Sequence, residues 1–101
     1  MTTIYKYSYG EGCGEFTLMM PAEAVILSTH LDANDDLCFW ALVDTSLPLV
    51  ERTFYCVGTG WDLEELNEMK ENAVINFIGT VKKGSYIWHL FEFIDGEESE
   101  N

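Results

Sequence analysis

Seven apolar residues follow one another without a polar interruption and end at Asp44: Leu37-Cys38-Phe39-Trp40-Ala41-Leu42-Val43. A strand with one face in water would alternate apolar and polar side chains. Seven residues suit a strand better than a helix, and Phe, Trp and Val favour the pleated backbone. The stretch therefore predicts a central strand that is buried on both faces. We expect the rest of the chain to pair beside this strand or to pack over it.

Further strand-like segments lie on both sides of the central strand. The predicted strands cover residues 3–9, 15–20, 24–31, 37–43, 52–57, 73–81 and 85–94. The first two predict a hairpin across a glycine-rich turn, because glycine tolerates positive φ. The turn 32–36 predicts a second hairpin, and Lys82-Lys83-Gly84 predicts a third. Pro48 excludes a paired interior strand from the segment 45–50.

Residues 62–71 form the one predicted helix. Leu63 and Leu66 recur at helical spacing and predict the face that docks on the sheet. Asp62 can cap the helix, and Glu65 three residues later completes a capping-box pattern. Together with the strands, this predicts a mainly β (β-rich α+β) fold. The expected architecture is an antiparallel six- to seven-stranded sandwich or partly open barrel, with one short helix near residues 62–71.

The length of 101 residues predicts one β-rich domain over residues 1–94, followed by an acidic, mobile tail over residues 95–101. Cys13, Cys38 and Cys56 make an odd count with no C-x-x-C pattern, which favours a reducing cytoplasm over a disulfide framework. The first residues lack a signal-peptide pattern, and no apolar run approaches the ~20 residues that span a bilayer. We therefore expect a cytoplasmic protein.

The net charge of −13 is the strongest functional signal in the sequence. Residues 32–36, 62–71 and 95–101 carry net charges of −3, −4 and −4, which is −11 of the total within 22 residues. This balance opposes direct binding to nucleic acid or to an anionic membrane. It permits binding to a basic protein surface, if the three segments lie on one side. The alternative interpretation is that acidity only keeps the protein soluble.

No residue pattern predicts a reaction, a cofactor or a metal site. Asp32, Asp35 and Asp36 lack the spacing and glycine of a calcium loop. His30 and His89 have no close partner for a zinc site, and Cys38 and Cys56 sit in apolar runs where a thiol behaves as a small hydrophobe. Gly58-Thr59-Gly60 is a turn rather than a phosphate loop. We therefore predict a protein that is not an enzyme.

Two weaker binding patterns remain open. Tyr5, Tyr7 and Tyr9 share one face of the first predicted strand and could stack bases, but only Lys6 is near them in sequence, so a packed or partner-facing aromatic stripe is favoured. Five basic or titratable side chains could hold a small anion if the fold gathered them. They are Lys6, Arg52, Lys82, Lys83 and His89.

A set of short motifs in fixed order resembles a family of small proteins encoded by bacteriophages and prophages. The motifs are Thr3-Ile4-Tyr5-Lys6-Tyr7, Trp40-Ala41-Leu42-Val43-Asp44-Thr45, Arg52-Thr53-Phe54, Gly58-Thr59-Gly60, Phe77-Ile78-Gly79-Thr80 and Trp88-His89-Leu90-Phe91-Glu92. The resemblance spans residues 3–92 and implies no reaction or catalytic residue. The acidic helix and the acidic tail depart from the expected pattern, so both are candidates for what is special to this chain.

The resemblance and the charge together lead to one hypothesis. It is a non-enzymatic, phage-type inhibitor of a basic, nucleic-acid-handling host defence protein, in the manner of an anti-CRISPR protein. The predicted partner-binding residues are Asp32, Asp35, Asp36, Asp62, Glu64, Glu65, Glu68 and Glu71. One alternative is a binder that sequesters a small nucleotide signal, and another is an accessory phage protein without an inhibitory role. A homodimer is a further option.

Overall fold

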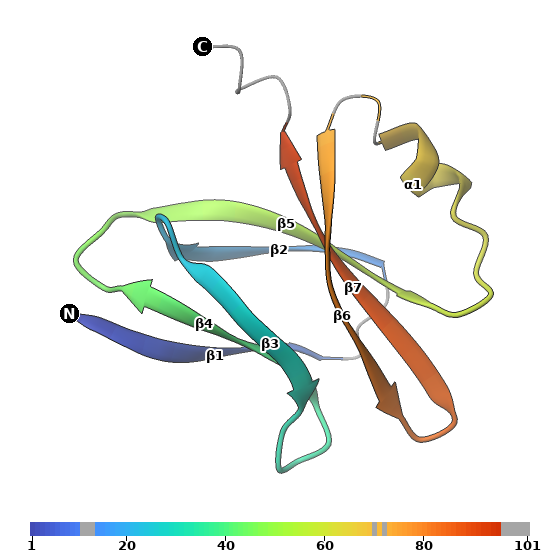
Figure 1. The fold of residues 1–101 in the computed structure, drawn as a ribbon, viewed down its shortest axis with the longest axis horizontal. Coiled ribbons are helices and arrows are strands. Elements are labelled where there is room, and N and C mark those ends of the chain that lie inside the picture. The colour runs from blue at the N-terminus through green and yellow to red at the C-terminus, as the bar shows by residue number, and fades with distance from the viewer. Residues whose placement is uncertain (11–13, 70, 72, 96–101) are drawn as a thin grey trace.

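The computed structural model describes residues 1–10, 14–69, 71 and 73–95. It contains seven antiparallel strands, which form two sheets, and one short helix (Figure 1). The elements are β1 (Thr2–Gly10), β2 (Gly14–Pro21), β3 (Val25–Leu31), β4 (Leu37–Asp44), β5 (Leu49–Gly58), α1 (Glu64–Met69), β6 (Ala73–Lys83) and β7 (Tyr86–Asp95). The strand orders are β1-β4-β3 and β2-β5-β7-β6. The predicted β-rich sandwich is confirmed, and the sheets do not close into a barrel.

The predicted central strand is β4, which pairs with β1 on one side and β3 on the other. Phe39, Ala41 and Val43 point into the space between the sheets and are buried. The predicted burial of both faces is only partly correct, because Trp40 is half-buried and Leu42 is 40% exposed. The unbroken apolar run therefore has two parts. Phe39, Ala41 and Val43 face the core, whereas Trp40 and Leu42 lie on the outer face of the three-stranded sheet.

Aromatic rings connect the two sheets across the core. Tyr7 stacks on Phe39 with a centroid distance of 5.3 Å, and Phe39 lies 5.2 Å from Phe54 of the opposite sheet. Phe16 stacks on Phe54 at 5.3 Å and on Tyr9 at 5.2 Å. Such contacts contribute about 0.5–1.5 kcal/mol each beyond the burial of area. Tyr7 and Tyr9 are therefore core side chains, as the packed interpretation of the tyrosine stripe predicted.

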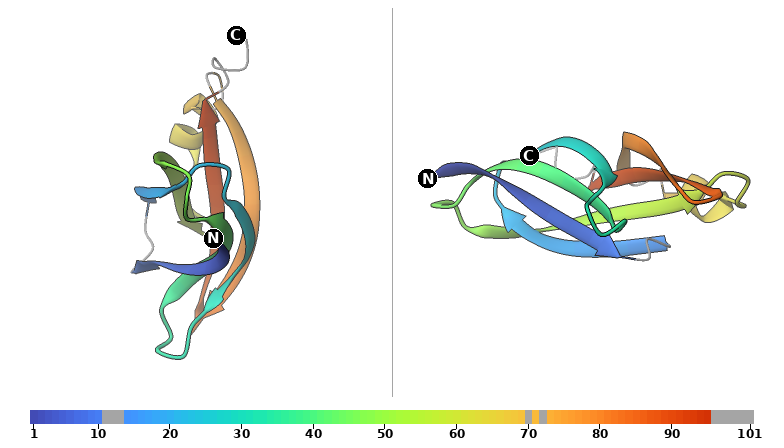
Figure 2. Two further views of the ribbon diagram at one scale, coloured as in Figure 1. Left: turned by 90° about the vertical axis from the view of Figure 1, so that its left-hand side faces the viewer. Right: turned by 90° about the horizontal axis from the view of Figure 1, so that it is seen from below.

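The predicted first hairpin is wrong in its pairing. Its two strands exist, but β1 pairs with β4 and β2 pairs with β5, so they lie in different layers (Figure 2). Both strands alternate with an aromatic face, and these faces meet across the sandwich, where Tyr9 stacks on Phe16. Alternation shows that a strand has an apolar face and does not show which strand lies beside it.

Several boundaries also differ from the prediction. The helix covers six residues instead of ten, and β5 begins at Leu49, directly after Pro48. Lys82 and Lys83 belong to β6, so the turn to β7 is tighter and uses Gly84 at φ 60°. The acidic tail predicted for residues 95–101 lies outside the described residues except for Asp95, which ends β7.

The strands β3 and β6 meet at one seam between the two sheets. A Cβ atom on Gly79 would lie 2.7 Å from Thr29 Cγ2, which is closer than real contacts allow. The register of β6 against β7 shifts between Phe77 and Gly79, as expected for a β-bulge beside this contact. Thr29 is buried, and its hydroxyl donates to the Cys38 carbonyl at 2.8 Å. Glycine at position 79 thus permits the close approach of β3 and β6.

Candidate partner-binding surface

The acidic helix α1 begins with the predicted cap. The Asp62 carboxylate accepts a hydrogen bond from the Glu64 backbone N–H at 3.0 Å. Glu64 and Glu65 then occupy the first turn, where the helix dipole favours negative charge. Glu65 does not complete a capping box, because its carboxylate accepts a hydrogen bond from the Tyr55 hydroxyl at 2.9 Å. This bond raises the pKa of Tyr55 and ties α1 to β5.

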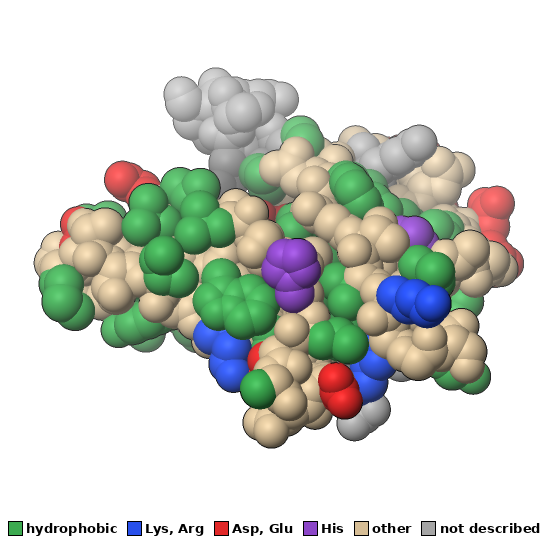
Figure 3. Space-filling model, turned by 60° about the horizontal axis from the view of Figure 1, so that its bottom comes forward, with side chains coloured by type: hydrophobic (Ala, Val, Ile, Leu, Met, Phe, Trp, Pro, Cys, Tyr) green, Lys and Arg blue, Asp and Glu red, His purple; other side chains and the backbone are tan. Residues whose placement is uncertain are grey.

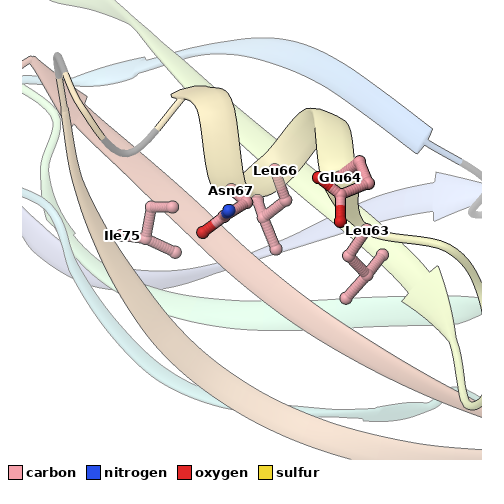
Figure 4. Close-up of a pocket in the computed structure, with 5 residues that line it drawn as sticks. All are labelled: Leu63, Glu64, Leu66, Asn67 and Ile75. Carbon is pink, nitrogen blue, oxygen red and sulfur yellow. The ribbon is translucent and has the colours of Figure 1, made fainter.

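The apolar side of α1 docks on the four-stranded sheet. Leu63 and Leu66 are half-buried and point from the helix toward the sheet, near Ile75 of β6 (Figure 4). Glu64 and Asn67 join them around an open pocket of about 460 Å³. Leu63 and Leu66 therefore face the sheet, as predicted, across this open pocket. A helix of six residues is not stable alone, so its position depends on these contacts.

The exposed carboxylates in and beside α1 form the acidic helix surface, which we define as Asp62, Glu64, Glu68 and Glu71. All four residues are exposed. Among the described residues, the lysine and arginine ion pairs are Lys6–Asp32 and Arg52–Glu92, and neither involves α1. Within the described part of the chain, these carboxylates have no lysine or arginine partner. Glu65 is also exposed but already binds Tyr55.

The second predicted acidic segment, residues 32–36, has a mainly structural role at its first residue. The Asp32 carboxylate accepts from Lys6 Nζ at 2.9 Å and from the backbone N–H groups of Asn34 and Asp36 at 2.8 and 3.0 Å. The Lys6 hydrogen bond is the largest of the effects that hold the pKa of Asp32 well below its usual range. Asp32 therefore shapes the β3–β4 turn, and we leave it out of the proposed contact surface. Asp35 is exposed and Asp36 is half-buried.

The acidic segments do not form one continuous surface. The helix α1 and the β3–β4 turn lie at opposite ends of the molecule in Figure 1 and in the left view of Figure 2. The structure thus separates Asp35 and Asp36 from Asp62, Glu64 and Glu68. Of the two described acidic segments, the acidic helix surface is the larger group of exposed carboxylates.

The five candidate anion-binding residues are also dispersed. Lys6 is paired with Asp32 on the outer face of the three-stranded sheet. His89 accepts or donates hydrogen bonds with Thr59 at 2.6 Å and Thr80 at 3.0 Å. Lys82 and Lys83 lie at the end of β6. The structure therefore does not bring Lys6 together with His89 or with these lysines.

Arg52 is held by an ion pair between neighbouring strands of the four-stranded sheet, β5 and β7, which sequence analysis missed. Its Nε and Nη2 atoms donate to the two carboxylate oxygens of Glu92 at 2.6 and 2.8 Å, and Nη1 donates to the Ala24 carbonyl at 2.7 Å. Glu92 is buried. Glu92 is the single acid inside the apolar run 86–94, and this position could have indicated an ion pair, because a buried charge needs a partner.

The other candidate chemical groups are also separate. Among the described residues, no group of three or more His, Cys, Asp and Glu side chains could hold a metal ion. Cys38 and Cys56 are buried, as predicted, and burial raises the pKa of the Cys38 thiol. His30 is exposed beside Trp40, with a ring distance of 6.2 Å. Cys13 lies outside the described residues.

Comparison with known proteins places the sequence of this chain in a family. Residues 1–101 match the family described as Domain of unknown function (DUF7352). The chain belongs to the DUF7352 family. No curated protein and no solved structure gives a significant match. Within the described part of this DUF7352 chain, no helix is long and apolar enough to cross a membrane.

Proposed function

We propose that the chain is a non-enzymatic binding protein whose acidic helix surface contacts a basic surface on another protein. The observation that carries the proposal is the state of Asp62, Glu64, Glu68 and Glu71. All four are exposed in a chain of net charge −13, and no described lysine or arginine forms an ion pair with them. Oriented, uncompensated charge steers association with a surface of opposite sign.

The partner class follows from the same charge. A cluster of lysine and arginine on one face of a protein is the electrostatic footprint of nucleic-acid binding. Blocking such a surface would inhibit the partner. The phage-like resemblance of the sequence adds that the partner is a host defence protein, such as a CRISPR effector, and this remains part of the proposal.

The small-ligand alternative has less support. It requires the basic side chains to converge on a pocket, whereas Lys6 and Arg52 are neutralised by Asp32 and Glu92. The described residues that line the pocket beside α1 include Glu64 and no basic side chain. An anionic nucleotide would meet a carboxylate there without a compensating charge.

The proposal can be tested by capture from a nuclease-treated bacterial lysate with three forms of the protein. The first is the wild type, and the second is the double variant Glu64→Gln/Glu68→Gln, which removes two charges from one helix face. The third is Glu23→Gln/Glu51→Gln, which removes two exposed charges elsewhere. Both variants have a net charge of −11, so they differ only in where charge is lost.

We expect the wild type and the Glu23→Gln/Glu51→Gln variant to capture the same basic nucleic-acid-binding protein at low salt. The helix variant should capture clearly less of it, and added salt should reduce capture by all three forms. Equal capture by both variants would show that net charge, rather than the acidic helix surface, determines binding. Capture that is indifferent to salt would contradict the electrostatic contact itself.

A further inference from the structure

The outer edge of β1 is a long strand edge without the usual protection. β1 pairs with β4 along one edge, and no described strand pairs with the other. Its register is regular from Thr2 to Ser8. Free edges of this kind present unpaired N–H and C=O groups that can pair with another chain, unless charge, proline, a bulge or a neighbouring element protects them.

The other terminal strands carry such protection. β2 carries Glu15 and ends at Pro21, and β6 carries a bulge together with Lys82 and Lys83. β3 is approached by β6 at the Gly79–Thr29 contact. β1, in contrast, contains only one charged residue, Lys6, and that charge is paired with Asp32 at 2.9 Å. The register shift of β1 lies at its end, between Ser8 and Gly10.

An apolar row ends at this free edge. The strand registers place Ile4 opposite Leu42 and Leu42 opposite Val25, so one residue from each strand lies in line across the sheet. All three are open to solvent, with exposures of 54%, 40% and 55%. Figure 3 views the molecule with this side turned forward and shows hydrophobic side chains gathered on it. A row of exposed apolar residues that stops at an unpaired edge indicates an interaction surface.

We propose that two copies of the chain pair antiparallel through β1, with Ile4 opposite Ile4 of the second copy. The three-stranded sheets then join into one six-stranded sheet. The apolar row continues from Val25, Leu42 and Ile4 into the same residues of the other copy, so the surface is complementary to itself, as a two-fold interface requires. The joined edge is a β-augmentation in which main-chain hydrogen bonds supply the pairing.

Charge favours this register and restricts where two copies can meet. Pairing centred on Lys6 would set two lysines opposite each other, which is unfavourable, whereas pairing centred on Ile4 sets Lys6 opposite Thr2. Two copies of net charge −13 repel each other, so self-association requires a contact away from the acids. The β1 edge meets this requirement, because α1 lies at the other end of the molecule from the start of β1 in Figure 1 and in the right view of Figure 2.

The test begins with the mass of the full chain in solution, measured by sedimentation over a range of concentrations. We expect a concentration-dependent dimer whose dissociation constant falls as salt is added, because salt screens the repulsion between copies. Ile4→Lys should weaken the dimer by roughly a hundredfold, since two lysines then face each other at the axis. Val74→Lys is the matched control, because Val74 is equally exposed, at 52%, on β6. It should leave the dimer unchanged.

A crosslink tests the register directly. In a Cys13→Ser background, Ile4→Cys should form a disulfide dimer on mild oxidation, because opposed residues of paired strands have the short Cα separation that a disulfide needs. Val74→Cys should not. A chain that stays monomeric throughout, or a dimer indifferent to Ile4→Lys and not linked through Ile4→Cys, would overturn the proposal. Added salt should strengthen the dimer and weaken binding to the proposed basic partner. The dimer proposal and the partner proposal can therefore fail independently.

Discussion

At the scale of single residues, the Arg52–Glu92 pair is the clearest energetic feature of the core. Both carboxylate oxygens of Glu92 are used, and the buried carboxylate is held by Arg52 of the neighbouring strand β5. Glu92→Gln should therefore lower the free energy of unfolding by about 3 kcal/mol, because it leaves the Arg52 guanidinium without its counter-charge. Urea denaturation measures this loss.

The control for this prediction removes both charges together. Arg52→Met/Glu92→Leu should cost much less than Glu92→Gln, because an apolar pair of similar volume leaves no uncompensated charge. If the single and double variants lose the same free energy of unfolding, the pair is not a coupled unit and the prediction is wrong.

Tyr9 should make the fold less stable at alkaline pH. Burial raises the pKa of Tyr9 from 10.0 to about 12. The folded state therefore retains a proton that the unfolded state loses, so the contribution to stability is complete below pH 10 and is lost between pH 10 and about 12. Tyr9→Phe should flatten the decline in urea midpoint across this range. Tyr86→Phe, at a 68% exposed position, should leave the decline as it is in the wild type.

At the scale of elements, the close approach of β3 and β6 depends on the absence of a side chain at Gly79. Gly79→Ala should destabilise the fold by about 1–3 kcal/mol, because its Cβ meets Thr29 Cγ2 at 2.7 Å. Thr29→Ser removes that methyl group and keeps the hydroxyl that bonds Cys38 and Tyr9. In a double-mutant cycle by chemical denaturation, Thr29→Ser should recover much of the loss. Strictly additive effects would show that the two strands do not meet there.

The elements themselves were largely predictable, and their pairing was predicted correctly for the β3–β4 and β6–β7 hairpins but not for β1 and β2. Alternation and unbroken apolar runs located all seven strands, and Asp62 with Leu63 and Leu66 located the helix and its docking side. The partner of β1 was missed because Tyr9 and Phe16 stack across two layers rather than along one sheet. Local periodicity has no information about which of two facing layers a strand joins.

The candidate surface was predictable only in part. The exposure of Glu64, Glu65 and Glu68 followed from helical spacing. The Lys6–Asp32 and Arg52–Glu92 ion pairs did not follow from spacing, since each pair joins residues at least 26 positions apart. Sequence reasoning therefore predicted too many acidic residues for the contact surface and too many basic residues for an anion site. Long-range ion pairs neutralise a member of each group.

At the scale of the whole molecule, two faces have different chemistry. The acidic helix surface lies at one end, and the neutral edge of β1 with its apolar row begins at the other. Salt should weaken a contact through the first and strengthen a contact through the second. A dimer through β1 would present two acidic helix surfaces to a partner, so partner binding and self-association are compatible.

The most direct test of the acidic helix surface is the rate at which the protein associates with the basic protein captured from lysate. A biosensor measurement should compare the wild type, Glu64→Gln/Glu68→Gln and Glu23→Gln/Glu51→Gln at several salt concentrations. We predict that the helix variant associates several-fold more slowly at low salt, while the variant of equal net charge keeps the wild-type rate and high salt removes the difference. Identical association rates for the two variants at every salt concentration would contradict the account.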